Sequence, residues 1–519
     1  MVVAQAVRNL IVRRSVVAGL ALLALTAGSA LRVRAESAPA PTAAPGAVRA
    51  VPSPTPIRID GAFADWPAGA YLAADGRYLY VRFTLPEART IQASDLPLVL
   101  AIDARAEGAF APDLRITFSP RETSAQGVAV AAVRHGVDDP KLGHAALDLV
   151  VAPTVAAREF ELRVARDVRG RPDLTAALAA GRVRVQAALL RPDGSPAWRS
   201  RARQIELPPR DDAAGSGASA IPAKEPGTVR VVSWNVLLAS PREKPEPFAR
   251  VLRALAPDLL LLQEWEGGTG EEIAAWLDAW LPGEPAWRAR TSDGWGVAVA
   301  ARGDLGELLP QHVARPDAAP ADARRSDVAL RIAGGVAVTA LGPVCAASLH
   351  LKCCGAAASV QDEARRAEAA RANEVLRDAW SAHAPCVRVV GGDLNLVGSR
   401  DPLDVLAAGR DPDGGALAVG ETPVLGDAAV YTWSQAWSRF SPGRLDWLLH
   451  GRDVRALRAF VLDARRLGAA TLAAAGVERS DGGASDHLPL VLDLGRREGA
   501  GASPDGADPA RTGGAGRPD

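Results

Sequence analysis

The chain has 519 residues, with 60 basic and 60 acidic side chains and a hydrophobic content of 48%. A single hydrophobic core rarely serves more than roughly 250–300 residues, so the length excludes one compact domain and predicts two. The apolar content is ample for folded cores, and it excludes a chain that is disordered throughout.

The first 35 residues have the pattern of a secretory signal peptide. Three arginines precede the apolar run 15–31, and small-residue cleavage sites follow at Ala30 and Ala35. The run is short for a membrane span, although an uncleaved anchor is the alternative. We therefore predict an exported protein, periplasmic or extracellular. No other stretch is long and apolar enough to cross a membrane, so we predict no stable span after cleavage.

Segments rich in Pro, Ala and Gly divide the chain. Residues 36–52 and 208–227 are predicted linkers, and residues 497–519 form a tail without periodicity. Two folded segments are expected between them, at 53–207 and 228–496.

Four cysteines lie in the second segment, and none of them forms a CxxC pair. A structural zinc site is therefore not expected. An exported protein can hold a disulfide, but the sequence does not choose among Cys345, Cys353, Cys354 and Cys386. The adjacent pair Cys353–Cys354 is poorly placed to bond with itself.

The first folded segment contains short β-rich runs bounded by turn residues, which predict an all-β sandwich. The runs are 78–85, 96–103, 114–120, 145–153 and 158–166.

The start of this segment, "IRIDGAFADWP" followed by "DGRYLYVRF", loosely resembles the carbohydrate-binding-module-like sandwiches appended to secreted enzymes. The resemblance implies a glycan ligand. Trp66, Tyr78, Tyr80 and Trp198 would then offer ring faces to a sugar. The alternative is that these aromatic side chains fill a core.

The second segment alternates strands and helices, which predicts β-sheets covered by helices. Helices are expected at 245–255, 270–281 and 359–380. Strands are expected at 228–236, 257–264, 294–302, 327–333, 335–341, 345–351, 386–394, 444–451 and 488–494.

Polar side chains recur where these apolar strands begin or end. One such residue would be an ordinary turn, but six positions predict a single cleft across one edge of the sheets. The residues are Asn235, Glu264, His350, Asp393 with Asn395, Asp446, and Asp486 with His487.

These residue types suit a metal-assisted attack on phosphorus. Carboxylate and amide oxygens are the hard ligands that Mg²⁺ prefers, and Glu264 is the best single candidate, with Asn235 on the neighbouring strand. A carboxylate behind a histidine, as Asp446 behind His487, would fix the tautomer of the ring and raise its basicity.

The motifs "SWNV", "LQE", "SLHL", "GGDLN", "GRLDWLL" and "SDHLPL" together resemble the endonuclease/exonuclease/phosphatase superfamily, in its order and spacing. The resemblance covers nearly all of residues 228–496. It implies an α/β fold, a four-layered sandwich of two mixed β-sheets flanked by helices. It also implies a metal-dependent hydrolase of phosphoric esters that uses Mg²⁺, or Mn²⁺ or Ca²⁺.

The same resemblance implies a role for each motif residue. Asn235, Glu264 and Asp486 would hold the metal. Asp393 would activate the attacking water or protonate the leaving oxygen. The phosphate would be contacted by Asn395 and His350, and His487, paired with Asp446, would be a general base or a phosphate contact. For Lys352, Arg365 and Asn373 the sequence does not separate a phosphate contact from a structural role.

The substrate stays open among nucleic acid, a lipid headgroup and a small phosphoester. The DNA-repair branch usually carries an acid two residues after the first asparagine, where this chain has Leu237. Residues 228–496 hold 29 Lys and Arg against 34 Asp and Glu, which disfavours non-specific duplex binding. The alternative function is a non-catalytic exported glycan- or surface-binding protein with a relic enzyme domain. We expect a monomer.

Overall fold

The computed structural model describes residues 57–497 except 106–107, 121–125, 135–136, 180, 212–219, 294–295 and 317–328. The predicted signal peptide, the linker 36–52 and nearly all of the predicted tail lie outside the described residues. Within the described part of the chain, no helix combines the length and apolar character that a membrane span requires.

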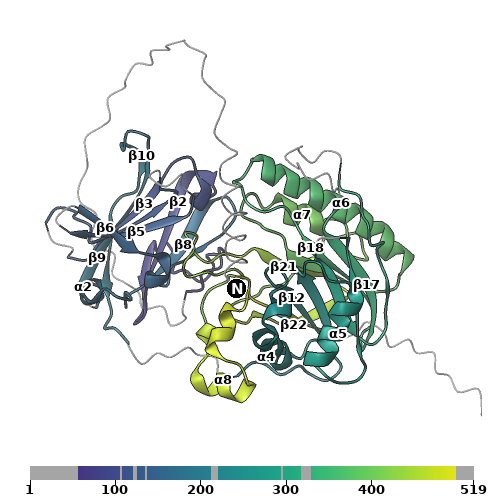
Figure 1. Ribbon diagram of the computed structural model, residues 1–519. Coiled ribbons are helices and arrows are strands. Elements are labelled where there is room, and N and C mark those ends of the chain that lie inside the picture. Colours follow the sequence, from purple (N-terminus) through teal and green to yellow (C-terminus); the bar gives the residue numbers. More distant parts are fainter. Residues whose placement is uncertain are drawn as a thin grey trace, which may run out of the picture. The chain divides into compact units, whose positions relative to one another are not determined.

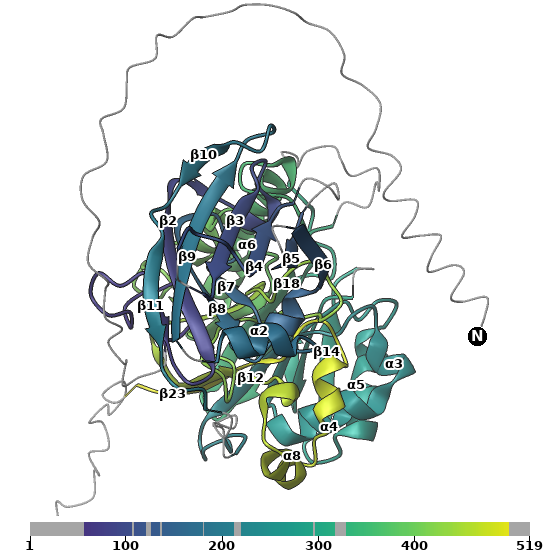
Figure 2. The same cartoon turned by 90° about the vertical axis from the view of Figure 1, so that its left-hand side faces the viewer.

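The N-terminal part is a sandwich of two antiparallel sheets. One sheet has the order β1-β2-β8-β7, and the other has the order β10-β9-β3-β4-β5-β6, with β11 also paired to β9. Figure 2 shows β9, β3, β4 and β5 side by side. The strands are β1 (Leu72–Ala74), β2 (Tyr78–Arg89), β3 (Leu98–Asp103), β4 (Leu114–Phe118), β5 (Val128–Arg134), β6 (Val137–Leu142), β7 (Val150–Ala152), β8 (Ala157–Ala165), β9 (Gly181–Leu190), β10 (Pro196–Arg199) and β11 (Arg203–Leu207). The predicted all-β sandwich is confirmed.

The first part of strand β2, residues 78–81, is buried on both faces, which explains its run of apolar and aromatic residues. Leu79, Val81 and Phe83 pack into the core between the two sheets. Tyr78 and Tyr80 point the other way and join a core that contains residues of the C-terminal part. Successive side chains of a strand alternate between its faces, so each face of β2 serves a different core.

The aromatic side chains that we considered as glycan contacts are mostly buried. Trp66, Tyr78 and Tyr80 are at most 7% exposed. The Trp66 indole N–H donates to Glu161 Oε2 at 2.5 Å, and the hydroxyls of Tyr78 and Tyr80 donate to Asp148 and Asp75. Trp198 is partly buried and packs against the sandwich core. These four rings therefore fill cores, which was the alternative interpretation.

The C-terminal part contains two mixed six-stranded sheets, with the orders β14-β15-β13-β12-β23-β22 and β16-β17-β18-β19-β21-β20. In each sheet one central pair is parallel, β12 with β13 and β18 with β19, and the other pairs are antiparallel. The strands are β12 (Val229–Asn235), β13 (Leu259–Gln263), β14 (Trp287–Thr291), β15 (Ala298–Arg302), β16 (Leu305–Glu307), β17 (Ile332–Thr339), β18 (Gly342–His350), β19 (Val387–Asp393), β20 (Ala418–Val419), β21 (Asp446–His450), β22 (Val454–Val461) and β23 (Leu490–Arg496).

Helices cover the outer face of each sheet. Side chains of α4 (Pro245–Leu255) and α5 (Gly270–Trp280) pack on one face of β12 and β13. On the other sheet, α6 (Val360–Ala382) and α7 (Asp401–Ala407) pack on β18 and β19 (Figure 1). A third core lies between the sheets, where Val231 and Leu261 join Ala346 and Val389. The predicted four-layered sandwich is confirmed.

Strand β17 corrects one detail of the sequence prediction. We expected two strands, at 327–333 and 335–341, with Gly334 between them, whereas a single strand runs from Ile332 to Thr339. A Cβ on Gly334 or Gly335 would lie 2.8 Å from Leu309 or 2.5 Å from Leu305, respectively. The glycines therefore let side chains approach the strand closely, and they do not form a turn.

A buried charge cluster joins the sandwich to the C-terminal part. Arg163 of β8 is fully buried and binds Asp427, and it also lies 3.4 Å from Asp148. Arg466 in turn binds Asp148 through two nitrogens. The two parts thus share ion pairs as well as a core, and the predicted boundaries between domains stay a prediction.

The four cysteines are free thiols. Cys345 is buried on β18 beside Cys386, and a hydrogen bond between these two thiols raises the pKa of Cys345 far above its usual range. The exposed pair Cys353 and Cys354 has its sulfur atoms 2.8 Å apart.

Candidate active site

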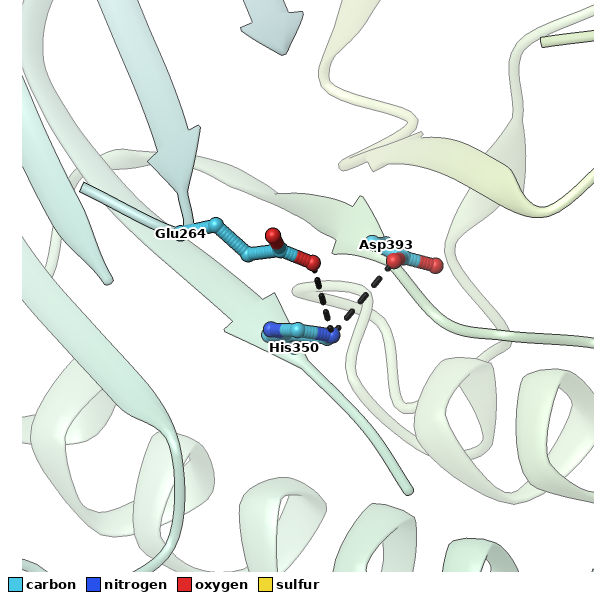
Figure 3. A group of neighbouring side chains, drawn as sticks. All are labelled: Glu264, His350 and Asp393. Carbon is cyan, nitrogen blue, oxygen red and sulfur yellow. Dashed lines mark ion pairs between the residues drawn. The ribbon is translucent and has the colours of Figure 1, made fainter. Parts of the chain in front are cut away.

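The central strands of both sheets deliver polar side chains to one place. Asn235 ends β12 and Glu264 follows β13, while His350 and Asp393 are register partners at the ends of β18 and β19. The carboxyl ends of neighbouring parallel strands meet at one edge of a sheet. Figure 3 shows Glu264, His350 and Asp393 pointing toward one another from three elements.

Asn235 bridges the two carboxylates of this group. Its Nδ2 donates to Glu264 Oε1 at 2.9 Å and to Asp393 Oδ2 at 3.1 Å. Its Oδ1 accepts the main-chain N–H of Leu237, and Glu264 Oε2 accepts the N–H of Leu238. In this orientation the amide holds the acids apart by donating to both. The opposite amide orientation would be needed for Asn235 to act as the predicted metal ligand.

Asp446 and His487 form a hydrogen-bonded pair beside Asp393. Asp446 Oδ2 lies 2.8 Å from His487 Nδ1, and His487 Nε2 lies 3.7 Å from Asp393 Oδ2. Burial by itself would lower the pKa of His487. The charges of Asp446 and Asp393 outweigh that effect and raise the pKa to about 10. His487 is therefore an imidazolium at neutral pH, with Nδ1–H donated to Asp446 and Nε2–H directed toward the centre of the site.

His350 is the opposite kind of histidine. Burial first, and then the charges of Arg331 and His487, hold its pKa well below the usual range, so the ring is neutral. Its Nδ1 lies 3.3 Å from an Arg331 nitrogen, which can only donate. Nδ1 is therefore the acceptor, and Nε2 carries the hydrogen. Nε2 lies 3.5 Å from Asp393 Oδ2 and 4.0 Å from Glu264 Oε1, so it offers a donor to an oxygen in this space.

Asp393 is 1% exposed at the centre of the group. Burial raises the pKa of its carboxyl, His487 lowers it and Asp446 raises it again, with a result of about 7. A carboxyl with this pKa can exchange a proton near neutral pH, which is the property of a general acid or base.

The donor set fits a hard divalent cation. Glu264, His350 and Asp393 form one group whose polar side-chain atoms lie within 4.8 Å of one another, and Asp393, Asp446 and His487 form another. Both histidines present N–H groups to this space, so the carboxylate oxygens are the atoms that would take a cation. Asp446 Oδ1 is buried and has no hydrogen-bond partner among the described residues. A cation between the carboxylates would satisfy oxygens that burial otherwise makes costly.

Asn395 and Asp486 lie beside this centre with side-chain hydrogen bonds of their own. The main-chain N–H of Asn395 donates to Asp393 Oδ1 at 2.9 Å, and its Nδ2 donates to the carbonyl of Leu351. Asp486 Oδ2 accepts the Trp433 indole N–H at 3.1 Å, while its Oδ1 has no partner among the described residues. Asp486 belongs to neither group of candidate ligands, so its metal role stays a prediction.

Sequence reasoning missed Arg331, which orients His350. It precedes β17, and the pairing of Ile332 with Leu349 places it next to His350. A single arginine within the apolar run "DVALRIA" was the available signal. Gln263 was also missed. It donates to Ser348 Oγ at 2.9 Å and so joins the two sheets beneath the site.

Two residues that the sequence left undecided are structural. Arg365 is fully buried and donates to the carbonyls of Lys352 and Cys354, so it shapes the loop after His350. Asn373 donates to three main-chain carbonyls at the end of α7.

Solved structures with a similar course of chain include an endonuclease/exonuclease/phosphatase from Bacteroides vulgatus (15% identity, 52% of this chain and 99% of that one, TM-score 0.35). Two further structures are each 17% identical to this chain, and the similarity covers 51% of this chain and 99% of theirs. They are a mannosyl-6-phosphatase from Bacteroides thetaiotaomicron (TM-score 0.34) and sphingomyelinase C from Streptomyces griseocarneus (TM-score 0.33). At these TM-scores the likenesses carry no argument about substrate.

No curated protein matches the chain. The match that carries the assignment is to a family. Residues 232–487, which run from the middle of β12 to His487, match the Endonuclease/Exonuclease/phosphatase family. Residues 232–487 are therefore similar to the Endonuclease/Exonuclease/phosphatase family.

Proposed function

We propose that the protein is an exported phosphoesterase that depends on a divalent cation. The observation that carries the proposal is the continuous chain of polar contacts from Asp446 through His487 to Asp393, with Asn235 and Glu264 completing it. Export is inferred from the signal-like first 35 residues, which stand apart from the family assignment.

The cation would be held by Glu264, and when bound it would neutralise charge on the phosphoryl oxygens. His487 donates through Nε2, and His350 donates through the tautomer that Arg331 imposes. These two donors converge on the space beside Asp393 Oδ2. Preorganised donors of this kind stabilise charge that develops on oxygen during the reaction.

Asp393 is the group that moves a proton. Its pKa of about 7 lets it accept a proton from water or return one to the leaving oxygen. Its Oδ1 is fixed by the Asn395 N–H, and its Oδ2 faces both histidines. His487, as an imidazolium, is already protonated, so the arrangement favours a phosphate contact over a general base for this histidine.

The test is hydrolysis of bis(p-nitrophenyl) phosphate by the full chain, with Mg²⁺, with Mn²⁺ and with EDTA. We expect EDTA to abolish turnover and added Mg²⁺ or Mn²⁺ to restore it. Glu264→Gln and His487→Ala should each lower kcat/KM by roughly 10²- to 10⁴-fold, the usual contribution of such groups.

Matched controls are Glu266→Gln, on an exposed acid two residues from Glu264, and His383→Ala, on an exposed histidine. Both should keep activity within about twofold, and thermal unfolding should show all four variants folded. Turnover that persists unchanged in Glu264→Gln or His487→Ala would refute the site. The non-catalytic alternative predicts no turnover with any cation. The natural substrate would follow from a screen of plasmid DNA, RNA, sphingomyelin and small phosphoesters.

A further inference from the structure

A loop of the C-terminal part, Ser434–Pro442, begins and ends beside the site. Its flanking residues Trp433 and Gly443 pair through main-chain hydrogen bonds, so the loop is closed at its base. Trp433 also forms a bridge with His487 and donates its indole N–H to Asp486. Beyond Gly443 the chain enters β21 at Asp446. The loop therefore stands between the two strands that deliver Asp446 and His487.

The β-sandwich holds this loop in place. Gln92 Oε1 accepts the Ser441 N–H at 3.0 Å, and the Val128 N–H donates to the Arg439 carbonyl at 2.7 Å. The ring of His144, 2% exposed, faces the main chain of the loop at Ser438 and Gln435, while its Nε2 has no hydrogen-bond partner among the described residues. These contacts are all made to the main chain, so they fix the path of the loop whatever its side chains are.

The fit between sandwich and loop leaves no room for change at Gly127. Its φ is +102°, and a Cβ there would lie 2.6 Å from the Arg439 carbonyl oxygen. Any side chain at this position would both strain the backbone and push the loop away.

Other contacts of the sandwich fall on the remaining loops near the site. Thr90 Oγ1 accepts the Ala357 N–H at 3.2 Å, on the loop that follows His350. The Ala156 N–H donates to the Gly398 carbonyl at 2.8 Å, just after Asn395. Thr154 Oγ1 accepts the Arg444 N–H at 2.8 Å, just before Asp446.

The loop also carries Trp437, whose side chain is 82% exposed. A free indole face stacks well on another planar ring. The base of the loop that presents this ring is bonded to Asp486 and paired with His487 through Trp433.

We propose that the β-sandwich is a positioning element of the active site and not a separate glycan-binding module. Through Gln92, Val128 and His144 it fixes the Ser434–Pro442 loop, and Trp437 on that loop stacks on the base of a nucleoside phosphoester. This proposal rests on the proposed phosphoesterase function, and it names the substrate class.

Two esters with the same leaving group test it: thymidine 5′-(p-nitrophenyl phosphate) and methyl p-nitrophenyl phosphate. Both release p-nitrophenolate, so one absorbance assay follows both. Trp437→Ala should raise KM for the thymidine ester about 5- to 100-fold, the range of base–aromatic stacking, and leave KM for the methyl ester within twofold. The value of kcat should change little for either ester.

The sandwich variants should reproduce this pattern in weaker form. Gln92→Ala and His144→Ala should raise KM for the thymidine ester roughly 3- to 10-fold with kcat retained, and Gln92→Glu, which keeps an acceptor oxygen, should rescue most of the loss. The control is Gln186→Ala, because Gln186 bonds only within the sandwich, to the Ser200 carbonyl. Equal effects on both esters, or no effect on either, would overturn the proposal.

Binding separates this inference from the proposed function. Titration of thymidine 5′-monophosphate into the full chain, with Ca²⁺ or EDTA, measures Kd without turnover, and Trp437→Ala should weaken it about 5- to 100-fold. A chain that hydrolyses neither ester but shows this Trp437-dependent Kd would refute the enzyme and leave the loop assignment standing. Turnover with values of Kd and KM that are unchanged in Trp437→Ala would support the phosphoesterase function and refute the role of the loop.

Discussion

Two of the buried charge clusters among the described residues are built differently. At the junction of the sandwich with the C-terminal part, Asp148 and Asp427 are each bound by arginines, Arg163 and Arg466. Burial by itself would raise the pKa of Asp148, but the charge of Arg163 and the hydrogen bonds of Arg466 hold it well below the usual range. Every charge in this cluster is permanently matched.

At the candidate active site, the carboxylates of Asp393 and Asp446 lie beside histidines and each other, and not beside arginines. Burial and Asp446 raise the pKa of Asp393 to about 7 in spite of His487, and Asp446 Oδ1 has no partner among the described residues. Guanidinium partners fix a carboxylate in its ionised form, which serves structure. Histidines and an unmatched oxygen leave the acids able to exchange a proton or bind a cation, which serves chemistry.

The largest effect expected within this comparison is on catalysis. Asp446→Asn removes the anion that keeps His487 protonated and oriented, so kcat should fall roughly 10²- to 10⁴-fold while the fold is retained. The assay is bis(p-nitrophenyl) phosphate hydrolysis, with Asp401→Asn, an exposed acid, as the control. An Asp446→Asn enzyme with normal kcat would show that the His487–Asp446 pair is structural.

The next effect is on stability. Arg163→Met leaves Asp427 buried beside an apolar side chain, and breaking a buried pair in this way should lower the free energy of unfolding by about 3–5 kcal/mol. Urea unfolding measures it. Arg400→Met is the matched control, because its pair with Asp404 is more than half exposed and should contribute less than about 1 kcal/mol. Equal losses in both variants would remove the distinction between the clusters.

Asp393→Asn should act in the opposite sense on stability. The folded pKa of about 7 lies above the ordinary 3.8, so ionised Asp393 costs folding free energy, and that cost grows as the pH rises from about 4 to 7. In EDTA the variant should be more stable than wild type at pH 8, and by less at pH 5, while it loses activity. Because the pKa rises from 3.8 to about 7 and each pKa unit corresponds to about 1.4 kcal/mol, the difference at pH 8 is at most about 4 kcal/mol. A variant that is less stable at pH 8 would contradict the assigned direction.

The smallest expected effect is on the stability of the fold at low pH. Because the pKa of Asp148 is depressed in the folded state, its stabilising contribution is complete above about pH 4 and is lost as the pH falls further. The difference in unfolding free energy between wild type and Asp148→Asn should therefore shrink below about pH 4. Urea titrations at pH 3 and pH 6 measure it, and a difference that is the same at both would show that the arginines do not control this carboxyl.

The sequence by itself indicated many of the elements and the residues of the candidate site. Helix α4 has the bounds that its apolar spacing predicted, β12 and β19 end at the polar residues that were singled out, and Glu264 directly follows β13. These features are local, because periodicity along a segment sets which residues face a core and where the segment stops. The order of the motifs then indicated a family, which the match of residues 232–487 bears out.

Only the tertiary structure decided what covers each surface and which charges meet. The sequence shows that Tyr78 and Tyr80 share one face of β2, but it does not show what covers that face. In the structure they pack in a core with residues of the C-terminal part and are not free to bind a sugar. Arg466 and Asp148 are 318 positions apart, and their contact depends on how the sandwich docks. Arg331 reaches His350 through the register of β17 with β18. Such contacts arise from packing between distant segments, whose free energy no local pattern encodes.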